Sequence, residues 1–163
     1  MHKKQIKNIL QLVLLLLIAG TLIFIYAQSV KPPEVSKEES DKVGEIIEEI
    51  IPPDTKPGEF IQTNLRKLAH FTEFFILGLE IALYGVFYTR SIKTQGLLLP
   101  LGVIFALFDE TIQIFSKRGP QIKDVWIDVL GYAIALISVY AVYYAARAII
   151  RYVKIKKTEK TEQ

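Results

Sequence analysis

The sequence predicts an all-α integral membrane protein: a four-transmembrane-helix bundle with an acidic, amphipathic extracytoplasmic loop helix. Of its 163 residues, 51% are hydrophobic, and they gather in four long runs. Basic residues flank these runs, as the positive-inside rule describes for membrane proteins, so the net charge of +3 does not indicate nucleic acid. The chain has no cysteine, which excludes disulfides, thiolate catalysis and cysteine-ligated zinc.

The first segment, residues 1–29, is predicted to be an N-terminal transmembrane helix. The stretch from Ile9 to Ala27 is apolar and close to the roughly 20 residues that cross a bilayer. A cleaved signal peptide is the competing interpretation. The run is longer than the usual apolar core of a signal peptide, and Ile25 fits a small-residue cleavage motif poorly, so an uncleaved helix is favoured.

Residues 30–63 are predicted to form an extracytoplasmic acidic loop with an amphipathic helix. Apolar residues from Val43 to Ile51 recur at helical spacing. Ser36 and Glu39 have the spacing of a capping box, and Pro52 follows as a helix terminator. Two interpretations remain open: a solvated surface helix, or a lid whose apolar stripe covers a polar site or the lipid surface.

Residues 64–152 are predicted to hold three more spans, over 68–88, 96–115 and 125 to about 150. Pro100 and Gly102 are expected to kink the middle one. Residues 153–163 read as a cytoplasmic polar tail. Basic residues at the N-terminus, at Arg90 and Lys93, and in the tail predict a multi-pass protein of the cytoplasmic membrane with both termini in the cytoplasm. The basic loop 116–123 would favour the opposite orientation, but three basic flanks support the first one against this single short loop.

Polar motifs flank the last three spans. The segment RKLAHFTEFFILG (66–78) starts the second span, DETIQIF (109–115) ends the third, and Asp124 and Asp128 start the fourth. In a four-span topology these three span ends lie on the same side of the membrane. We therefore expect their side chains to meet near one interface. Acids at such a level are costly to bury and indicate a partner or a function.

These motifs resemble those of the VanZ-like membrane proteins, a family named after an accessory protein for teicoplanin resistance. The resemblance covers about residues 64–150 and implies a VanZ-like three-helix core over 64–152. Phe74 stands where tyrosine is common in the family, and Asp128 where asparagine is common. The matching residues are Arg66, Lys67, His70, Phe71, Glu73, Phe74, Leu77, Gly78, Asp109, Glu110, Gln113, Phe115, Arg118, Asp124, Asp128 and Gly131.

The candidate site residues fall into two groups by chemistry. Those suited to proton transfer or metal binding, the catalytic candidates, are His70, Glu73, Asp109, Glu110 and Asp124. Those suited to holding a polar substrate or its phosphate are Arg66, Lys67, Gln113, Arg118 and Asp128. A histidine near acids serves as a proton-transfer group, as a metal ligand or as a purely structural pair. A divalent cation such as Mg, Mn or Ca suits this oxygen-rich set better than zinc.

Three functions are compatible with these residues. The first is an accessory protein that binds or acts on a cell-envelope lipid, a cell-wall precursor or a glycopeptide antibiotic at the outer membrane face. The alternative is a membrane enzyme that hydrolyses or transfers a lipid headgroup, with or without a divalent metal. The third is a small transporter that uses Glu80 as a proton relay. Glu80 is expected to face the bundle interior, either protonated or paired with a tyrosine hydroxyl.

Overall fold

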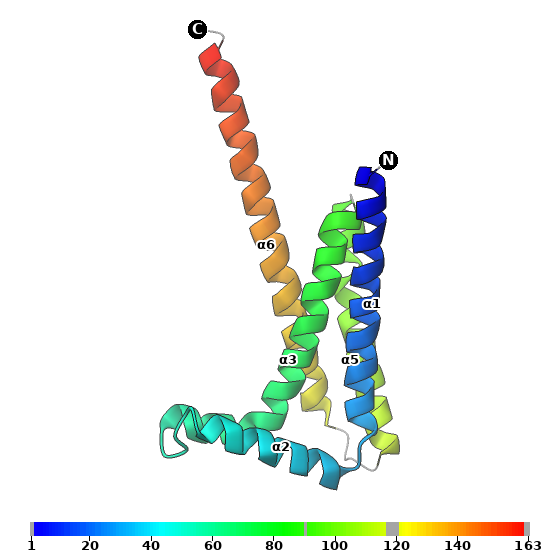
Figure 1. Cartoon of the computed structure of the whole chain (residues 1–163), viewed down its shortest axis with the longest axis vertical. Helices are drawn as coiled ribbons and strands as arrows, with labels where there is room; N and C mark the ends of the chain where they lie inside the picture. The colour runs from blue at the N-terminus through cyan, green and yellow to red at the C-terminus, as the bar shows by residue number, and fades with distance from the viewer. Residues whose placement is uncertain (1, 90, 117–120, 162–163) are drawn as a thin grey trace.

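A computed structural model describes residues 2–89, 91–116 and 121–161, which form helices and no strand. Five of the elements are long helices, and α4 is a single short turn (Figure 1). Their bounds are α1 His2–Val30, α2 Pro33–Glu48, α3 Lys56–Tyr88, α4 Ile92–Gly96, α5 Leu99–Phe115 and α6 Ile122–Thr161.

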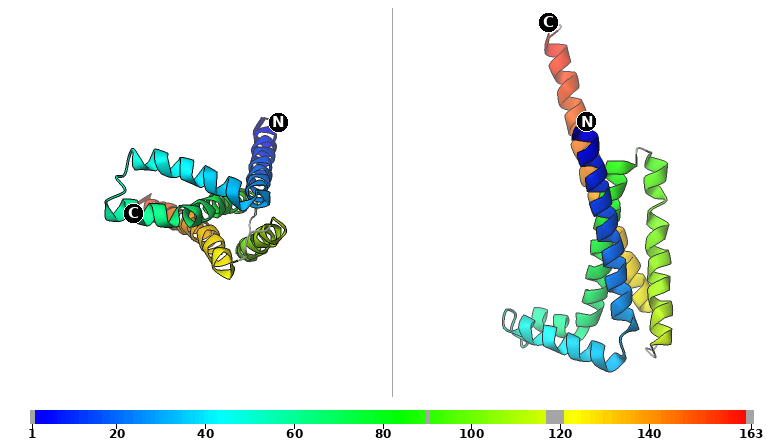
Figure 2. Two further views of the ribbon diagram at one scale, coloured as in Figure 1. Left: turned by 90° about the horizontal axis from the view of Figure 1, so that it is seen from below. Right: turned by 45° about the vertical axis from the view of Figure 1, so that its right-hand side comes forward.

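Four segments are long and apolar enough to cross a membrane, which confirms the predicted all-α membrane bundle. They are Lys4–Val30, Lys56–Tyr88, Ile92–Phe115 and Ile122–Thr158. Helix α3 packs against α1 and α6, and α5 packs against the same two helices from the other side. The four helices that are long and apolar enough to cross a membrane thus form a ring in the order α1, α3, α6, α5, which the view along the bundle also shows (Figure 2). Many apolar side chains outside the ring are exposed, as expected where lipid is the solvent.

The tightest contact in the ring is between α3 and α6, where glycine lets the two backbones approach. A Cβ atom added at Gly78 would collide with the backbone of Tyr132, and one added at Gly131 would collide with the backbone of Phe71. Small residues serve this purpose in membrane helix pairs. The Tyr132 ring is fully buried against Gly102 of α5, and its hydroxyl donates to the Leu98 carbonyl at 2.7 Å. Tyr132 therefore joins three helices in the apolar core.

Helix α2 lies crosswise at one end of the bundle, opposite the end where α1 begins and α6 finishes (Figure 1). It begins at Pro33, so Ser36 lies inside the helix, and no side chain caps its N-terminus. The predicted capping box of Ser36 and Glu39 is therefore wrong, because Pro33 in the first turn starts the helix earlier. The helix ends at Glu48, ahead of Pro52.

Three further boundaries differ from the sequence prediction. Helix α3 begins at Lys56, where Thr55 caps it by accepting from the Gly58 amide, so residues 56–63 belong to α3. The chain turns at 97–98, between α4 and α5, and Pro100 lies in the first turn of α5 instead of kinking a continuous helix. Helix α6 continues through residues 153–161.

Candidate functional site

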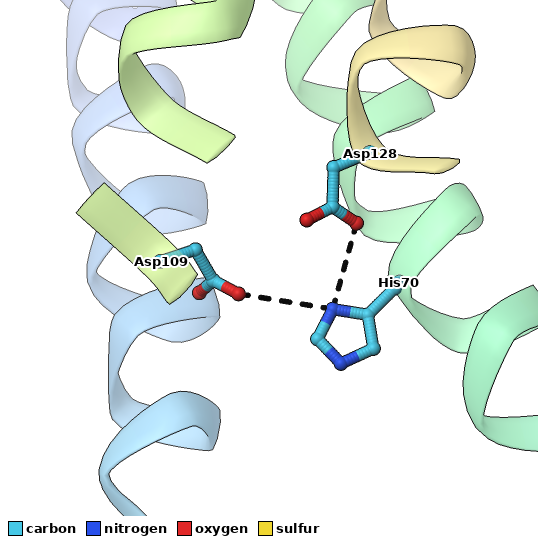
Figure 3. A group of neighbouring side chains, drawn as sticks. All are labelled: His70, Asp109 and Asp128. Carbon is cyan, nitrogen blue, oxygen red and sulfur yellow. Dashed lines mark ion pairs between the residues drawn. The ribbon is translucent and has the colours of Figure 1, made fainter. Parts of the chain in front are cut away.

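Three polar side chains from three different helices meet inside the ring, towards the α2 end. His70 comes from α3, Asp109 from α5 and Asp128 from α6 (Figure 3). The imidazole Nδ1 lies 3.8 Å from Asp109 Oδ2 and 3.6 Å from Asp128 Oδ1. Both aspartates are completely buried, and His70 is 8% exposed. The three motifs were predicted to converge, and one residue of each lies in a single buried cluster, which we call the His70 cluster.

Asp109 is held by two hydrogen bonds from opposite sides of the cluster. The Ser29 hydroxyl of α1 donates to Oδ1, and the Gln113 amide donates to Oδ2 at 2.7 Å. Gln113 is itself oriented by Arg66, whose guanidinium donates to the Gln113 side-chain oxygen at 3.0 Å. Because Asp109 and Gln113 are four residues apart, one face of α5 presents both. A chain of hydrogen bonds therefore runs from the protein surface at Arg66 to a buried carboxylate.

Asp128 differs from Asp109 in having no such support. Within the described part of the chain, neither of its carboxylate oxygens accepts a hydrogen bond. At 3.6 Å, its contact with His70 is too long for one. Four other acids, Glu73, Asp109, Glu110 and Asp124, lie within electrostatic range of it. An isolated buried carboxylate is costly, so this position requires a proton or a cation.

The remaining predicted acids surround the cluster without entering it. Glu110 is 6% exposed and accepts from the Gln121 backbone amide at 3.0 Å, which joins the end of α5 to the start of α6. Asp124 is 7% exposed, one turn before Asp128 on α6. Glu73 is half-buried, one turn after His70 on α3.

Two predicted site residues remain, Lys67 and Arg118. Lys67 is exposed, and its nearest polar contact is Asn64, at 3.5 Å. Arg118 lies outside the described residues. One contributor, Ser29, was missed by sequence reasoning, because a lone serine at the end of an apolar run carries no motif. The signal that could have found it is its position along the first span. Ser29 is one residue from the end of α1, at the same end of the bundle as the other motifs.

Glu80 is separate from this site. It lies ten residues after His70 on α3, and its Oε1 accepts a hydrogen bond from the Thr21 hydroxyl of α1 at 3.0 Å. Its partner is thus a threonine on the neighbouring helix, so the tyrosine pairing, one of the two expected states, is wrong, while the protonated state stays a prediction. Tyr84, one turn further along α3, accepts instead from Gln11 at 3.1 Å.

A groove of about 710 Å³ opens beside the His70 cluster, between α1, α2 and α3. Its polar members include Ser36, Ser40, Arg66, His70 and Glu73. Its apolar walls are Phe24, Val43, Ile47, Ile61, Leu65, Leu68, Ala69 and Ile76. Two residues of the apolar stripe of α2, Val43 and Ile47, line this space, whereas Ile46 and Ile50 are exposed elsewhere. His70 and Glu73 therefore belong both to the lining of the groove and to the surroundings of the buried carboxylates.

The fold and the site define a small polytopic membrane protein with a buried histidine–aspartate cluster. The VanZ/LLP1 family model matches residues 11–144, so the chain belongs to this family. The match begins within α1, earlier than the motif resemblance that starts near residue 64, and so includes the helix that contributes Ser29. No curated protein and no solved structure was found to match the chain.

Proposed function

We propose that this VanZ-family protein binds a cell-envelope amphiphile, either a lipid or a lipid-linked cell-wall precursor, in the groove between α1, α2 and α3. The observation that carries the proposal is the composition of the groove, in which apolar side chains from three helices stand beside the polar side chains of Arg66, His70 and Glu73. Small-molecule sites have this character and commonly occupy 300–1,000 Å³. An amphiphile matches this lining because its hydrocarbon chain can pack against the apolar side chains while its headgroup bonds to the polar ones.

Arg66, a basic residue of the groove lining, favours a headgroup that carries phosphate. Arg66 is exposed and lines the groove, and a guanidinium binds phosphate through two parallel hydrogen bonds. Arg66 also orients Gln113, which holds Asp109. A bound headgroup at Arg66 would thus be connected by two hydrogen bonds to the buried cluster. An accessory role in antibiotic resistance follows if the ligand is a target or precursor of cell-wall assembly.

The groove can be tested by filling it. Ala69 is exposed and lines the groove, whereas Ala145 is exposed on α6 and does not. We expect Ala69→Phe to reduce binding of phosphatidylglycerol or undecaprenyl phosphate, measured by native mass spectrometry in detergent, and Ala145→Phe to bind as the wild type does. Teicoplanin is a third probe for the glycopeptide alternative. Equal lipid binding by the two variants would refute the groove as the site.

A second candidate function is hydrolysis or transfer of a lipid headgroup. The observation that favours it is the position of His70, which lines the groove and also lies within 4 Å of two carboxylates. A histidine so placed can act as a general base towards a headgroup in the groove. Release of the headgroup from a defined lipid by purified protein, lost in His70→Ala, would establish this activity. Binding without turnover would leave the accessory role.

We also propose that the protein lies in the cytoplasmic membrane with both termini in the cytoplasm. The end of the bundle opposite α2 carries Lys4, Lys7 and Lys93, and α6 leaves that end through Arg147 and Arg151. Basic residues near the ends of spans remain on the cytoplasmic side. The acidic helix α2, the groove and the His70 cluster then lie towards the outer face.

A further inference from the structure

We propose that His70, Asp109 and Asp128 form a binding site for a first-row divalent transition-metal ion, Mn²⁺ or Zn²⁺. The three ligand atoms, His70 Nδ1 and one carboxylate oxygen from each aspartate, lie within 4.8 Å of one another. The inference is independent of the proposed amphiphile, because it rests on the buried cluster and not on the groove.

The two separations that involve the imidazole nitrogen match the spacing of ligands around one ion. Gaps of 3.6 and 3.8 Å from the imidazole nitrogen to the two carboxylates are longer than hydrogen bonds. Two ligands that are each about 2.0–2.2 Å from one ion lie roughly 3–4.4 Å apart, depending on the angle between them. The side chains also point towards one common space, with the imidazole nitrogen between the two carboxylates (Figure 3).

The charges of the cluster favour an ion as well. Asp109 and Asp128 are completely buried, and among the described residues both oxygens of Asp128 lack a hydrogen-bond donor. A divalent ion bound by two carboxylates and a neutral imidazole forms a site with no net charge. This neutrality removes the main cost of burying acids inside a membrane bundle.

The choice of metal follows from the ligand types. Carboxylate ligands suit Mg²⁺, Ca²⁺ and Mn²⁺, while imidazole suits Zn²⁺ and its neighbours in the first transition row. A set of one imidazole and two carboxylates is acceptable to Mn²⁺ and Zn²⁺ together. Compared with the sequence-based expectation of Mg, Mn or Ca, this choice keeps Mn²⁺ and adds Zn²⁺, because the nitrogen ligand gives Mg²⁺ and Ca²⁺ no advantage.

Outer hydrogen bonds hold the ligands as they do in established metal sites. Ser29 and Gln113 both donate to Asp109, and Arg66 fixes Gln113. All three ligands sit on helices, which position side chains more accurately than loops.

The test is metal binding by the full-length protein, purified in detergent and stripped with a chelator. Titration with Mn²⁺, followed by the loss of the free-ion electron paramagnetic resonance signal, should reveal a saturable site for which Zn²⁺ competes. Electron spin echo modulation from an imidazole nitrogen should accompany bound Mn²⁺ and disappear in His70→Ala. That signal requires an imidazole among the ligands, which the exposed acids of α2 alone cannot supply.

The variants make the assignment specific. Asp128→Asn should abolish the saturable site, while Asp124→Asn, which neutralises a buried acid one turn away on the same helix, should retain it. Ser29→Ala should weaken binding by about 10–100-fold, as for other outer-shell changes. Failure of the wild type to bind either ion at millimolar concentration overturns the proposal, whether or not any variant folds. So does a saturable site without the nitrogen signal, or one that survives Asp128→Asn unchanged.

Discussion

Asp109 and Asp128 are equally buried but differ in what surrounds their oxygens. Asp109 accepts hydrogen bonds from Ser29 and Gln113, whereas Asp128 accepts none from the described residues. An asparagine at position 109 has only one acceptor oxygen, so its amide group must face one of the two donors. An asparagine at position 128 loses no hydrogen bond and removes a charge from the vicinity of several other acids.

The two neutral isosteres should therefore have opposite effects on stability when measured in chelator. We expect Asp109→Asn to lower the free energy of unfolding by about 1–3 kcal/mol, the cost of leaving a buried donor unsatisfied. Asp128→Asn should leave it unchanged or raise it, because like charges no longer crowd the site. Melting temperatures in one detergent provide the comparison. A large loss in Asp128→Asn would instead indicate a structural ion pair with His70, for which removal of one partner costs about 3–5 kcal/mol.

Ser29 is expected to act through Asp109 alone. Ser29→Ala should destabilise the wild type but have a smaller effect in the Asp109→Asn background, because the hydrogen bond it removes is already altered there. Contacting residues usually show coupling free energies of about 0.5–3 kcal/mol. Ser138→Ala, at an exposed position on α6, is the control. Additive losses for Ser29→Ala and Asp109→Asn would show that the two side chains do not interact.

The charged residues of the site could be predicted from the sequence, whereas its serine could not, because the two kinds of side chain differ in the cost of burial. His70, Asp109 and Asp128 are charged or titratable groups beside apolar runs, where burial cost makes them conspicuous. Ser29 costs little to place anywhere in a membrane helix, because its hydroxyl also bonds back to the Ile25 carbonyl at 3.2 Å. Its contact with Asp109 spans 80 residues of sequence and arises only from the packing of α1 against α5.

At the scale of elements, the pair α3 and α6 forms the main contact of the bundle, and its closeness depends on glycine. Gly131→Leu should lower the free energy of unfolding by about 1–3 kcal/mol or more, because the side chain would overlap the backbone of Phe71. Gly20→Leu is the matched control, since no atom lies within 4 Å of a Cβ added there. Thermal unfolding monitored by circular dichroism measures both. Equal melting temperatures for the two variants would contradict the close approach of α3 and α6.

The helices could be predicted from their apolar runs, but several of their ends could not. Helix α3 begins at Lys56, because the Thr55 side chain caps it and Pro57 stands in its first turn, although residues 56–63 precede the apolar run and read as loop. The break at 97–98 falls inside an apolar run, and hydropathy carries no information on it. A tertiary contact accompanies this boundary: the Leu98 carbonyl accepts a hydrogen bond from the Tyr132 hydroxyl of α6, 34 residues away in the sequence.

For the whole molecule, the ring of four helices explains why the site is where it is. Each of α1, α3, α5 and α6 contributes to the buried network: Ser29 comes from α1, His70 from α3, Asp109 from α5 and Asp128 from α6. The His70 cluster together with its Ser29 hydrogen bond is therefore complete only when all four helices are assembled. Helix α2 runs outward from the same end of the bundle, so the groove it lines and the cluster both lie towards the end opposite the start of α1 and the end of α6 (Figures 1 and 2).

The orientation of this arrangement can be tested directly because the chain has no native cysteine. A cysteine at Glu49, exposed at the end of α2, should react with an impermeant maleimide in intact cells, and a cysteine at Thr158, exposed on α6, should react only after the membrane is opened. The physical reason is the basic end of the bundle, at Lys4, Lys7 and Arg151, which the positive-inside rule retains in the cytoplasm. Labelling both variants after permeabilisation controls for thiol reactivity. The reverse pattern would place α2 and the groove in the cytoplasm, and would exclude an outer-face ligand while leaving the cluster itself intact.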